Sequence, residues 1–518
     1  MFSGLYSDPP GTSDSHSFLD NWVSSPSDPL QSKASALVTF CFPNPSMLAP
    51  GSSAAQGYEV LKGIITADSI KHYLGLYKHF QNHWPMMHIS FNPVTAYDGL
   101  VLTMLCIGAV YSDRLGVEEV RWLMEVVRAS VFRSARVYTM ATQDTQQAVE
   151  TTPRTRSEVE EMQALVHIHS LFVWHGSPTQ RRQGRDEFWV LAKIVRQLGL
   201  LQPLPNRHQH HSALHQPGPI YGNELDSWTW SSWIEQEERA RLMYLIFLID
   251  ASLTIFFNVQ AQFDIYEIKL PLPADDAAWE ARSEEACASA LGLRGQAAQG
   301  TNSAGSRRPK QLGMSEALQF LHQGGDFPQR ATNAFSKFIL IHAIHVQIFK
   351  IQRQILNISS TPGFSSSGTS TPDGNISNGS SGYVTPTEGL NSQFSQAHQM
   401  LRQTVTALEL WKQQWDTDMQ IQYPSHERRV GFCRDGVHYY FLAKLFLRSS
   451  RREEWAAPPD VRCQQIFSLL KQIRAHVASD SASKGLDIGS ITTVNDNYGV
   501  ADLALNMKLL FTPISAAP

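Results

Sequence analysis

The sequence predicts an all-α protein with about a dozen helices, on the strength of three observations. Apolar residues recur at spacings of three and four in segment after segment, which places them on one face of a helix. No segment shows the alternation of apolar and polar residues that is typical of a half-buried strand. The chain has 518 residues, 42% of them hydrophobic and 17% charged, so it can bury a large core.

Composition divides the chain into four regions. Residues 1–57 are rich in Ser, Pro and Gly and are expected to be a disordered, weakly acidic tail. Residues 58–356 are expected to form the main helical body, followed by a Ser/Thr/Gly/Pro-rich linker at 357–392. Residues 393–518 are expected to be a C-terminal helical region that packs on the body.

The tail interleaves acidic and aromatic residues and has two open interpretations. It is either a disordered activation segment, for which this interleaving is typical, or an uncommitted tail. The residues concerned are Phe2, Tyr6, Asp8, Asp14, Phe18, Asp20, Trp22 and Asp28.

Helices of the first half are predicted in order from their apolar stripes. The first begins near Asp68, with Asp68 or Ser69 as its N-cap. Residues 100–112 form a buried helix in which the Gly108–Ala109 pair allows a neighbour to approach closely. The next helix runs from residue 117 to about residue 140.

Two more helices follow before the centre of the chain. Ser157 and Glu160 have the spacing of a capping box, in which hydroxyl and carboxylate bind free amide hydrogens at a helix start. Another helix is expected to start at Asp186 and to end at Gly199, a residue well suited to a C-cap. Later helices are expected at 331–356, 394–415, 437–447, 462–477 and 501–510.

The stretch from Trp228 to Pro273 organises the chain. Ser232 and Glu235 again have capping-box spacing, so a helix is expected to begin near Trp233. After Arg241 this helix has almost no polar side, and it must therefore be buried nearly all round.

This central stretch resembles the fungal-specific transcription factor domain, the regulatory middle homology region of fungal zinc-cluster and zinc-finger transcription factors. The resemblance rests on Trp233, Ile234, Glu238, Arg239, Arg241, Leu242, Phe247, Leu248, Asp250 and the segment Leu270-Pro271-Leu272-Pro273. The turn with Pro85, His88 and Phe91 matches the entry motif of the same family. His88 is expected to be a hydrogen-bonded core or turn residue without chemistry.

The resemblance implies a nuclear transcription regulator whose helical body mediates dimerisation, effector response or contact with other regulators. Control of a specific metabolic or biosynthetic gene set is a common role in the family. Arg241 and Asp250 would serve as buried or interfacial polar anchors. The resemblance implies no catalytic, cofactor-binding or metal-binding residue, and no enzyme.

Charge and cysteines bear on how such a regulator would reach DNA. The formal net charge is −4, and four aspartates within residues 1–32 account for it, so no basic footprint for nucleic acid is visible. The five cysteines are never arranged as CxxC, which fits a reducing compartment and indicates that the zinc module is absent from this chain. The regulator would then contact promoter DNA directly, through a DNA-binding partner, or with a module that lies outside this sequence. No signal peptide or membrane span is expected.

Two clusters keep an enzyme open as the alternative. Asp275 and Asp276, followed by Glu280, resemble the magnesium site of all-α enzymes that act on prenyl diphosphates, although a surface loop is the favoured interpretation. A loop with four histidines could bind a metal ion, but no acidic or thiol partner lies among them, so a polar insertion is favoured. These histidines are His208, His210, His211 and His215. A third class is a helical interaction scaffold outside the nucleus.

Overall fold

The computed structural model confirms the all-α class. It describes residues 27–142, 156–218, 226–293, 310–324, 331–359, 386–422, 436–448 and 457–483. Within these ranges the chain forms sixteen α-helices, more than the dozen expected, and two short 3₁₀-helices. The one β-type contact in the described part is an isolated bridge between Pro271 and Gly313.

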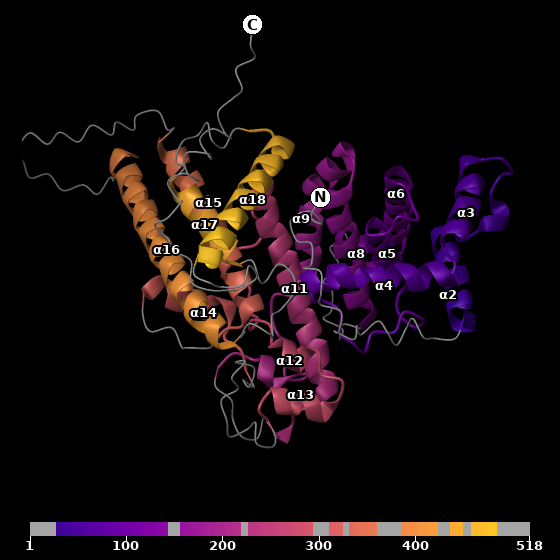
Figure 1. The fold of residues 1–518 in the computed structure, drawn as a ribbon, viewed down its shortest axis with the longest axis horizontal. Coiled ribbons are helices and arrows are strands. Elements are labelled where there is room, and N and C mark those ends of the chain that lie inside the picture. Colours follow the sequence, from indigo (N-terminus) through magenta and orange to yellow (C-terminus); the bar gives the residue numbers. More distant parts are fainter. Residues whose placement is uncertain are drawn as a thin grey trace, which may run out of the picture.

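The first half of the chain forms one group of helices, on the right of Figure 1. Helices α4, α5, α6, α8 and α9 pack in succession against one another, and α2 lies across α4, α5 and α6. The elements are α2 (Ser27–Cys41), η1 (Pro45–Met47), α3 (Ser53–Ile64), α4 (Ala67–His83), α5 (Asp98–Val110), α6 (Val117–Ser134), α7 (Arg136–Thr142), α8 (Arg156–His175), α9 (Pro178–Gln197) and η2 (Ala213–His215).

The second half forms a group on the left of Figure 1, except for two short helices, α12 and α13, which lie at the lower end of α11. Helices α15 and α16 pack along each other, and α17 joins α15 to α18. The elements are α12 (Asp276–Trp279), α13 (Glu284–Ala290), α14 (Met314–Gln323), α15 (Ala334–Ser359), α16 (Pro386–Gln422), α17 (Gly436–Arg448) and α18 (Pro459–Ser483).

Helix α11 (Trp230–Phe257) stands between the two groups. It contacts α8 and α9 on one side and α15 and α18 on the other. Every residue from Arg239 to Phe257 is buried, as the lack of a polar side predicts. Two helices, α11 and α15, are long and apolar enough to cross a membrane, but all of the apolar window in α11 and 89% of that in α15 are buried inside the fold. They are therefore core helices here.

Close packing of α4 on α5 depends on Gly108, as expected. A Cβ atom at position 108 would lie 2.0 Å from the backbone oxygen of Tyr73, a separation that no side chain can occupy. Glycine is required here because the two backbones touch.

Part of the expected N-terminal tail is helical, which corrects the prediction for residues 27–57. Helix α2 covers residues 27–41 and α3 begins at Ser53, and Leu30, Ala34 and Leu37 of α2 are buried in the main core. These apolar residues have helical spacing, but a Ser- and Pro-rich composition obscures it. Residues 1–26 lie outside the described residues.

Several helix boundaries differ from the predictions. Helix α4 is capped by Thr66, whose hydroxyl accepts a hydrogen bond from the amide of Ser69. The helix expected at 117–140 breaks at Ala135, where the backbone is extended, and resumes as α7. Helix α9 begins at Pro178 instead of Asp186, with Ser177 and Gln180 forming the capping box.

Neither Ser157 nor Ser232 holds the N-cap position that its proposed capping box requires, because α8 begins at Arg156 and α11 at Trp230. Helix α11 begins three residues earlier than predicted, after Thr229. The carboxylate of Glu235 lies 3.1 Å from His210, and that of Glu160 accepts a hydrogen bond from the amide of Tyr97. Each carboxylate therefore binds a segment that is distant from its own helix. In contrast, Gly199 takes the positive φ of a helix cap, as predicted.

Both ends of the linker predicted at 357–392 are helical, because α15 extends to Ser359 and α16 begins at Pro386. Residues 360–385 and the helix predicted at 501–510 lie outside the described residues.

Candidate functional site

A buried ion pair fixes the start of α11. Glu237 and Arg241 are each about 1% exposed, and Nε of Arg241 donates to Oε1 of Glu237 at 2.7 Å. The guanidinium also donates to the carbonyl oxygens of Ala274 at 2.8 Å and Pro85 at 3.3 Å. It lies 4.4 Å from the ring centroid of Trp279. Arg241 therefore joins three segments and acts as the polar anchor that the sequence predicts.

The charge of Glu237 is stabilised by its neighbours. Burial alone raises the pKa of this carboxyl, but Arg241 and His215 outweigh burial and hold the pKa below its usual value. Oε1 of Glu237 also accepts a hydrogen bond from the amide of Ala274 at 2.9 Å. The Pro-Leu-Pro segment is thereby attached to α11.

Asp250 anchors the other end of α11. It is 1% exposed and accepts hydrogen bonds from the amides of Gln262 and Phe263, each at 2.9 Å. Burial raises the pKa of Asp250 to about 7, although these hydrogen bonds oppose the rise. The loop that follows α11 is thus folded back onto the helix, starting at Asn258, which has a left-handed conformation.

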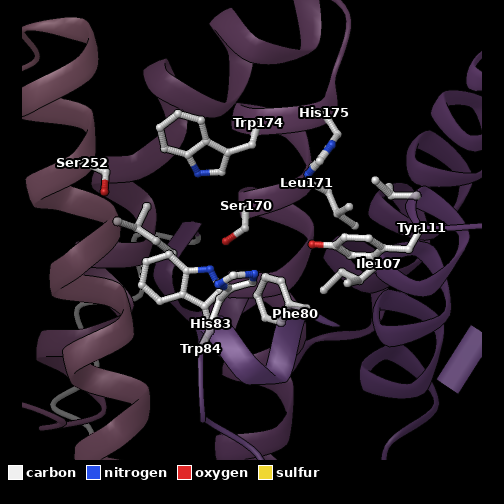
Figure 2. A pocket seen from close by; sticks show the side chains of 12 residues that line it. Phe80, His83, Trp84, Ile107, Tyr111, Ser170, Leu171, Trp174, His175 and Ser252 are labelled. Carbon is white, nitrogen blue, oxygen red and sulfur yellow. The ribbon is translucent and has the colours of Figure 1, made fainter. Parts of the chain in front are cut away.

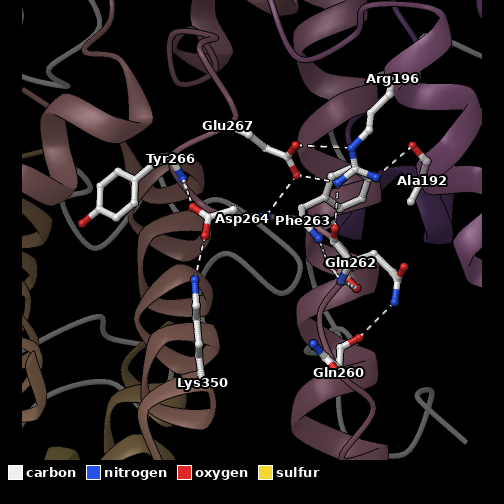
Figure 3. A network of polar contacts seen from close by, with 10 residues as sticks. Ala192, Arg196, Gln260, Gln262, Phe263, Asp264, Tyr266, Glu267 and Lys350 are labelled. Atoms are coloured by element: carbon white, nitrogen blue, oxygen red, sulfur yellow. Dashed lines mark hydrogen bonds and ion pairs between the residues drawn. The ribbon is translucent and has the colours of Figure 1, made fainter. Parts of the chain in front are cut away.

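This loop forms one wall of a groove of about 800 Å³. The other walls come from α15 and the first half of α16. Figure 3 shows how the loop is held: Asp264 pairs with Lys350 at 2.8 Å, and Glu267 pairs with Arg196 of α9 at 2.7 Å. Arg353 donates to the side-chain oxygen of Asn258 at 2.7 Å.

The groove is the candidate functional site because of its size and lining. Cavities of 300–1,000 Å³ accommodate most small organic ligands. The lining combines apolar side chains with amides and two cations, Lys350 and Arg353, against one carboxylate, Asp264. Sequence reasoning missed this site. The one local signal is Asn258 after a long apolar helix, where Asn favours a left-handed cap.

A second cavity is aromatic and small. Figure 2 shows Phe80, Trp84, Tyr111, Trp174 and His175 converging on it from α4, α8 and the segments beside them. Its free space is about 40 Å³, enough for a few water molecules but too little for a metabolite. Burial lowers the pKa of His175 to about 4, so this side chain is neutral at physiological pH.

The histidine loop acquires carboxylate partners that are distant in sequence. His215 is buried and lies 2.8 Å from the hydroxyl of Ser212 and 3.1 Å from Glu237. His210 lies 3.1 Å from Glu235. Both carboxylates belong to α11, more than twenty residues away, so a search for partners within the loop could not find them.

Asp275 is buried, which corrects the expectation of a surface loop. It is 5% exposed and holds the N-cap position of the one-turn helix α12. Among the described residues, no group of three or more His, Cys, Asp or Glu side chains is placed to hold a metal ion. His88 packs its ring against Trp279, with centroids 4.9 Å apart, and its Nδ1 lies 2.9 Å from the hydroxyl of Ser90.

The chain is similar to several fungal regulators. It is 23% identical over 224 residues to the nicotinate catabolism cluster-specific transcription factor of Emericella nidulans, which covers 43% of this chain and 23% of that protein. It is 33% identical over 140 residues to a transcription factor of Zymoseptoria tritici, covering 27% of this chain and 13% of that protein. Zinc finger protein zas1 of Schizosaccharomyces pombe is 23% identical over 224 residues, 43% of this chain and 22% of that protein. The matches thus span less than a quarter of each relative, and no solved structure matches the chain.

The family model of the fungal-specific transcription factor domain matches residues 75–413, more than half of the chain. This range begins in α4, includes α11 with both of its anchors, and ends in α16. The chain therefore belongs to the fungal-specific transcription factor domain family.

Proposed function

We propose that this protein is a nuclear regulator that controls a specific metabolic or biosynthetic gene set. The observation that carries the proposal is the continuous family match over residues 75–413. One relative is by name specific to a catabolic gene cluster, which supports a regulator dedicated to one pathway. The pathway itself does not transfer at 23% identity.

Promoter contact is made either by the protein itself or by a DNA-binding partner that recruits it. The near-neutral charge of the chain beyond residue 32 supports recruitment, because phosphate contacts need Lys and Arg concentrated on one face. The partner would be another transcription regulator, and the helical body could in addition pair with a second copy of this protein.

The groove between α15 and α16 is the proposed place of regulation. Its loop wall is tied to α11 through Asp250 and to α9 through Arg196, so a ligand seated there would act on both groups of helices. The substitution Lys350→Glu changes a side chain that is 66% exposed, so it should leave the fold intact. It should abolish the response of the target genes to the ligand. Lys62→Glu on α3 is the matched control. A normal response of the Lys350 variant would exclude the groove.

The test of the main proposal is chromatin immunoprecipitation of the tagged protein in its native host, combined with gel-shift binding by the purified chain. Enrichment without binding by the purified chain is expected if a partner recruits it. Enrichment with salt-sensitive direct binding would place a DNA-binding surface on this chain. No enrichment, with the protein outside the nucleus, would refute the regulator and favour the scaffold.

The enzyme alternative is not favoured. A prenyl diphosphate site needs several carboxylates that face an open cavity and share metal ions. Asp275 is instead buried beside Ala274, whose carbonyl oxygen binds Arg241. Magnesium-dependent turnover of a prenyl diphosphate that is lost in the Asp275→Ala, Asp276→Ala variant would restore this alternative.

A further inference from the structure

The outer face of α9 carries a solvent-facing stripe of which the proposed function uses only Arg196. Arg182, Asp186, Trp189, Lys193 and Arg196 follow one another at spacings of four and three, so they share one side of the helix. We call these five residues the α9 stripe. The opposite side, with Gly184, Phe188, Leu191 and Val195, is buried against α8 and its neighbours.

Trp189 is the unusual member of the stripe. Its side chain is 54% exposed, although tryptophan is mostly buried in folded proteins. On the same side of the helix, Arg182 lies about two turns before Trp189, and Lys193 lies about one turn after it. Trp and Arg are both enriched among the residues at which binding energy is concentrated in protein interfaces.

The charges around the stripe leave a positive excess. Helix α9 has five basic residues, and its two acidic residues are Asp186 and Glu187. Neighbouring elements add Arg128, which pairs with Glu187, and contribute Asp460, Glu267 and Glu125 as acids, the last accepting a hydrogen bond from Gln180 of α9. The balance is one positive charge. Asp460 is shared by Arg181 and Arg185, and Glu267 pairs with Arg196, whereas Arg182 and Lys193 have no ionic partner among the described residues.

The complementary segment is in the same chain. Residues 1–26 contain three aspartates, Asp8, Asp14 and Asp20, and no Lys or Arg. They also contain four aromatic residues, of which Phe18 and Trp22 flank Asp20. This segment precedes Ser27, the first residue of α2, and 26 extended residues reach about 85 Å. The radius of gyration of a compact chain of this length is about 24 Å, so α9 is within reach.

We propose that residues 1–26 dock on the α9 stripe of the same molecule, with an aromatic side chain against Trp189 and the aspartates near Arg182 and Lys193. Tethering raises the effective concentration of the segment to the millimolar range, so a weak contact suffices to keep it bound. The contact covers the acidic and aromatic side chains that another protein would otherwise bind. It is a property of the isolated chain and holds whether or not the protein regulates transcription.

The test is fluorescence anisotropy with a labelled peptide of residues 1–26 and the full chain. The wild-type chain should bind the peptide weakly, because its own segment occupies the stripe. The variant Asp8→Asn, Asp14→Asn, Asp20→Asn should bind the peptide at least about tenfold more tightly, since its own segment no longer competes. Raising NaCl from about 50 to about 300 mM should weaken this binding severalfold.

Further substitutions, made in that triple variant, locate the contact. Trp189→Ala with Lys193→Glu should weaken peptide binding at least about tenfold. Arg402→Glu with Val405→Ala, which makes the same kind of change on the exposed side of α16, should leave binding unchanged. Arg182→Glu alone provides a second stripe variant if the double substitution does not fold, as judged by circular dichroism.

Three results would overturn the proposal. Equal peptide binding by the wild-type chain and the triple variant would mean that no contact forms within the molecule. Unchanged binding by the folded stripe variants, or an equal loss in the α16 control, would mean that the peptide binds elsewhere or without specificity. A wild-type dimer that the stripe variants convert to a monomer, with no peptide binding, would identify a second copy as the occupant.

Discussion

At the residue scale, the Glu237–Arg241 pair is a costly place to remove one charge. Glu237→Gln keeps the shape of the side chain but leaves the Arg241 guanidinium buried without its carboxylate. Breaking a buried pair in this way destabilises a fold by about 3 kcal/mol. We therefore expect a clear drop in the urea midpoint of unfolding, measured by circular dichroism.

The control for this prediction is an exposed pair with the same chemistry. Glu118 and Arg121 of α6 are one turn apart, and the carboxylate is 84% exposed. Glu118→Gln should change the free energy of unfolding by less than about 1 kcal/mol, because water screens the pair. Equal midpoints for the two variants would show that Glu237 does not stabilise Arg241.

The roles of Arg241 and Asp250 could be predicted from sequence, but their partners could not. The family resemblance implied that both are polar anchors, and a charge within a long apolar helix must be satisfied when it is buried. Their partners lie elsewhere: Pro85 is 156 residues from Arg241, and Phe263 is 13 residues from Asp250 across a left-handed turn. Periodicity along one helix carries no information about such contacts.

At the element scale, the α4–α5 contact gives a sharp test. Gly108→Ala places a Cβ atom 2.0 Å from the Tyr73 carbonyl oxygen, so the two helices must separate. Such overpacking costs about 3 kcal/mol. Gly75→Ala, on the same α4, meets no atom within 4 Å and should stabilise the fold by about 0.5–1 kcal/mol. Thermal unfolding of the two variants should shift in opposite directions, and similar shifts would contradict the close approach.

The buried Lys337–Asp418 pair joins α15 to α16. The two groups are 2.7 Å apart and at most 2% exposed. Lys337→Met alone should destabilise the fold by about 3 kcal/mol, because it removes the ammonium group that pairs with the buried Asp418 carboxylate. The double variant Lys337→Met, Asp418→Leu should recover most of this loss, since an apolar pair needs no charge compensation. If the effects of the two substitutions on the free energy of unfolding, measured by urea denaturation, simply add in the double variant, Lys337 and Asp418 do not pair directly.

Helix boundaries show why sequence locates elements better than their ends. The apolar stripes of α5, α8, α11 and α15 are long, and each helix forms close to the predicted residues. A capping box depends on one short side chain, and the carboxylates of Glu235 and Glu160 each bind a residue that is distant in sequence. The groove could not be predicted because its walls come from the loop after α11, from α15 and from α16, which come together only in the folded chain.

At the scale of the whole molecule, the fold is expected to be sensitive to acid. Burial lowers the pKa of five core histidines to values of about 3 or 4, from an ordinary value of 6.5: His167, His169, His175, His342 and His345. Below pH 6.5 the unfolded chain binds protons at these sites and the folded chain does not. Stability from these groups is therefore complete above pH 6.5 and is lost as the pH falls toward 4.

Asp250 opposes this trend. Because burial raises its folded pKa from 3.8 to about 7, its folded form binds a proton that the unfolded form does not, and acidification from pH 7 to pH 4 stabilises the fold. One such group does not offset five histidines, so the net slope should favour neutral pH.

Urea denaturation between pH 8 and pH 5 tests the balance. Each neutral histidine should account for about 2 kcal/mol of the loss at pH 5. In His342→Phe the side chain remains among Phe338 and Tyr439 but can no longer be protonated, so the fall between pH 7 and pH 5 should shrink by about that amount. The control Val405→Ala, on the exposed side of α16, should show the same pH dependence of the free energy of unfolding as the wild type. If the free energy of unfolding of the wild type does not change with pH, these histidines become protonated inside the folded chain. That would require water to enter the core that holds α8, α11 and α15 together.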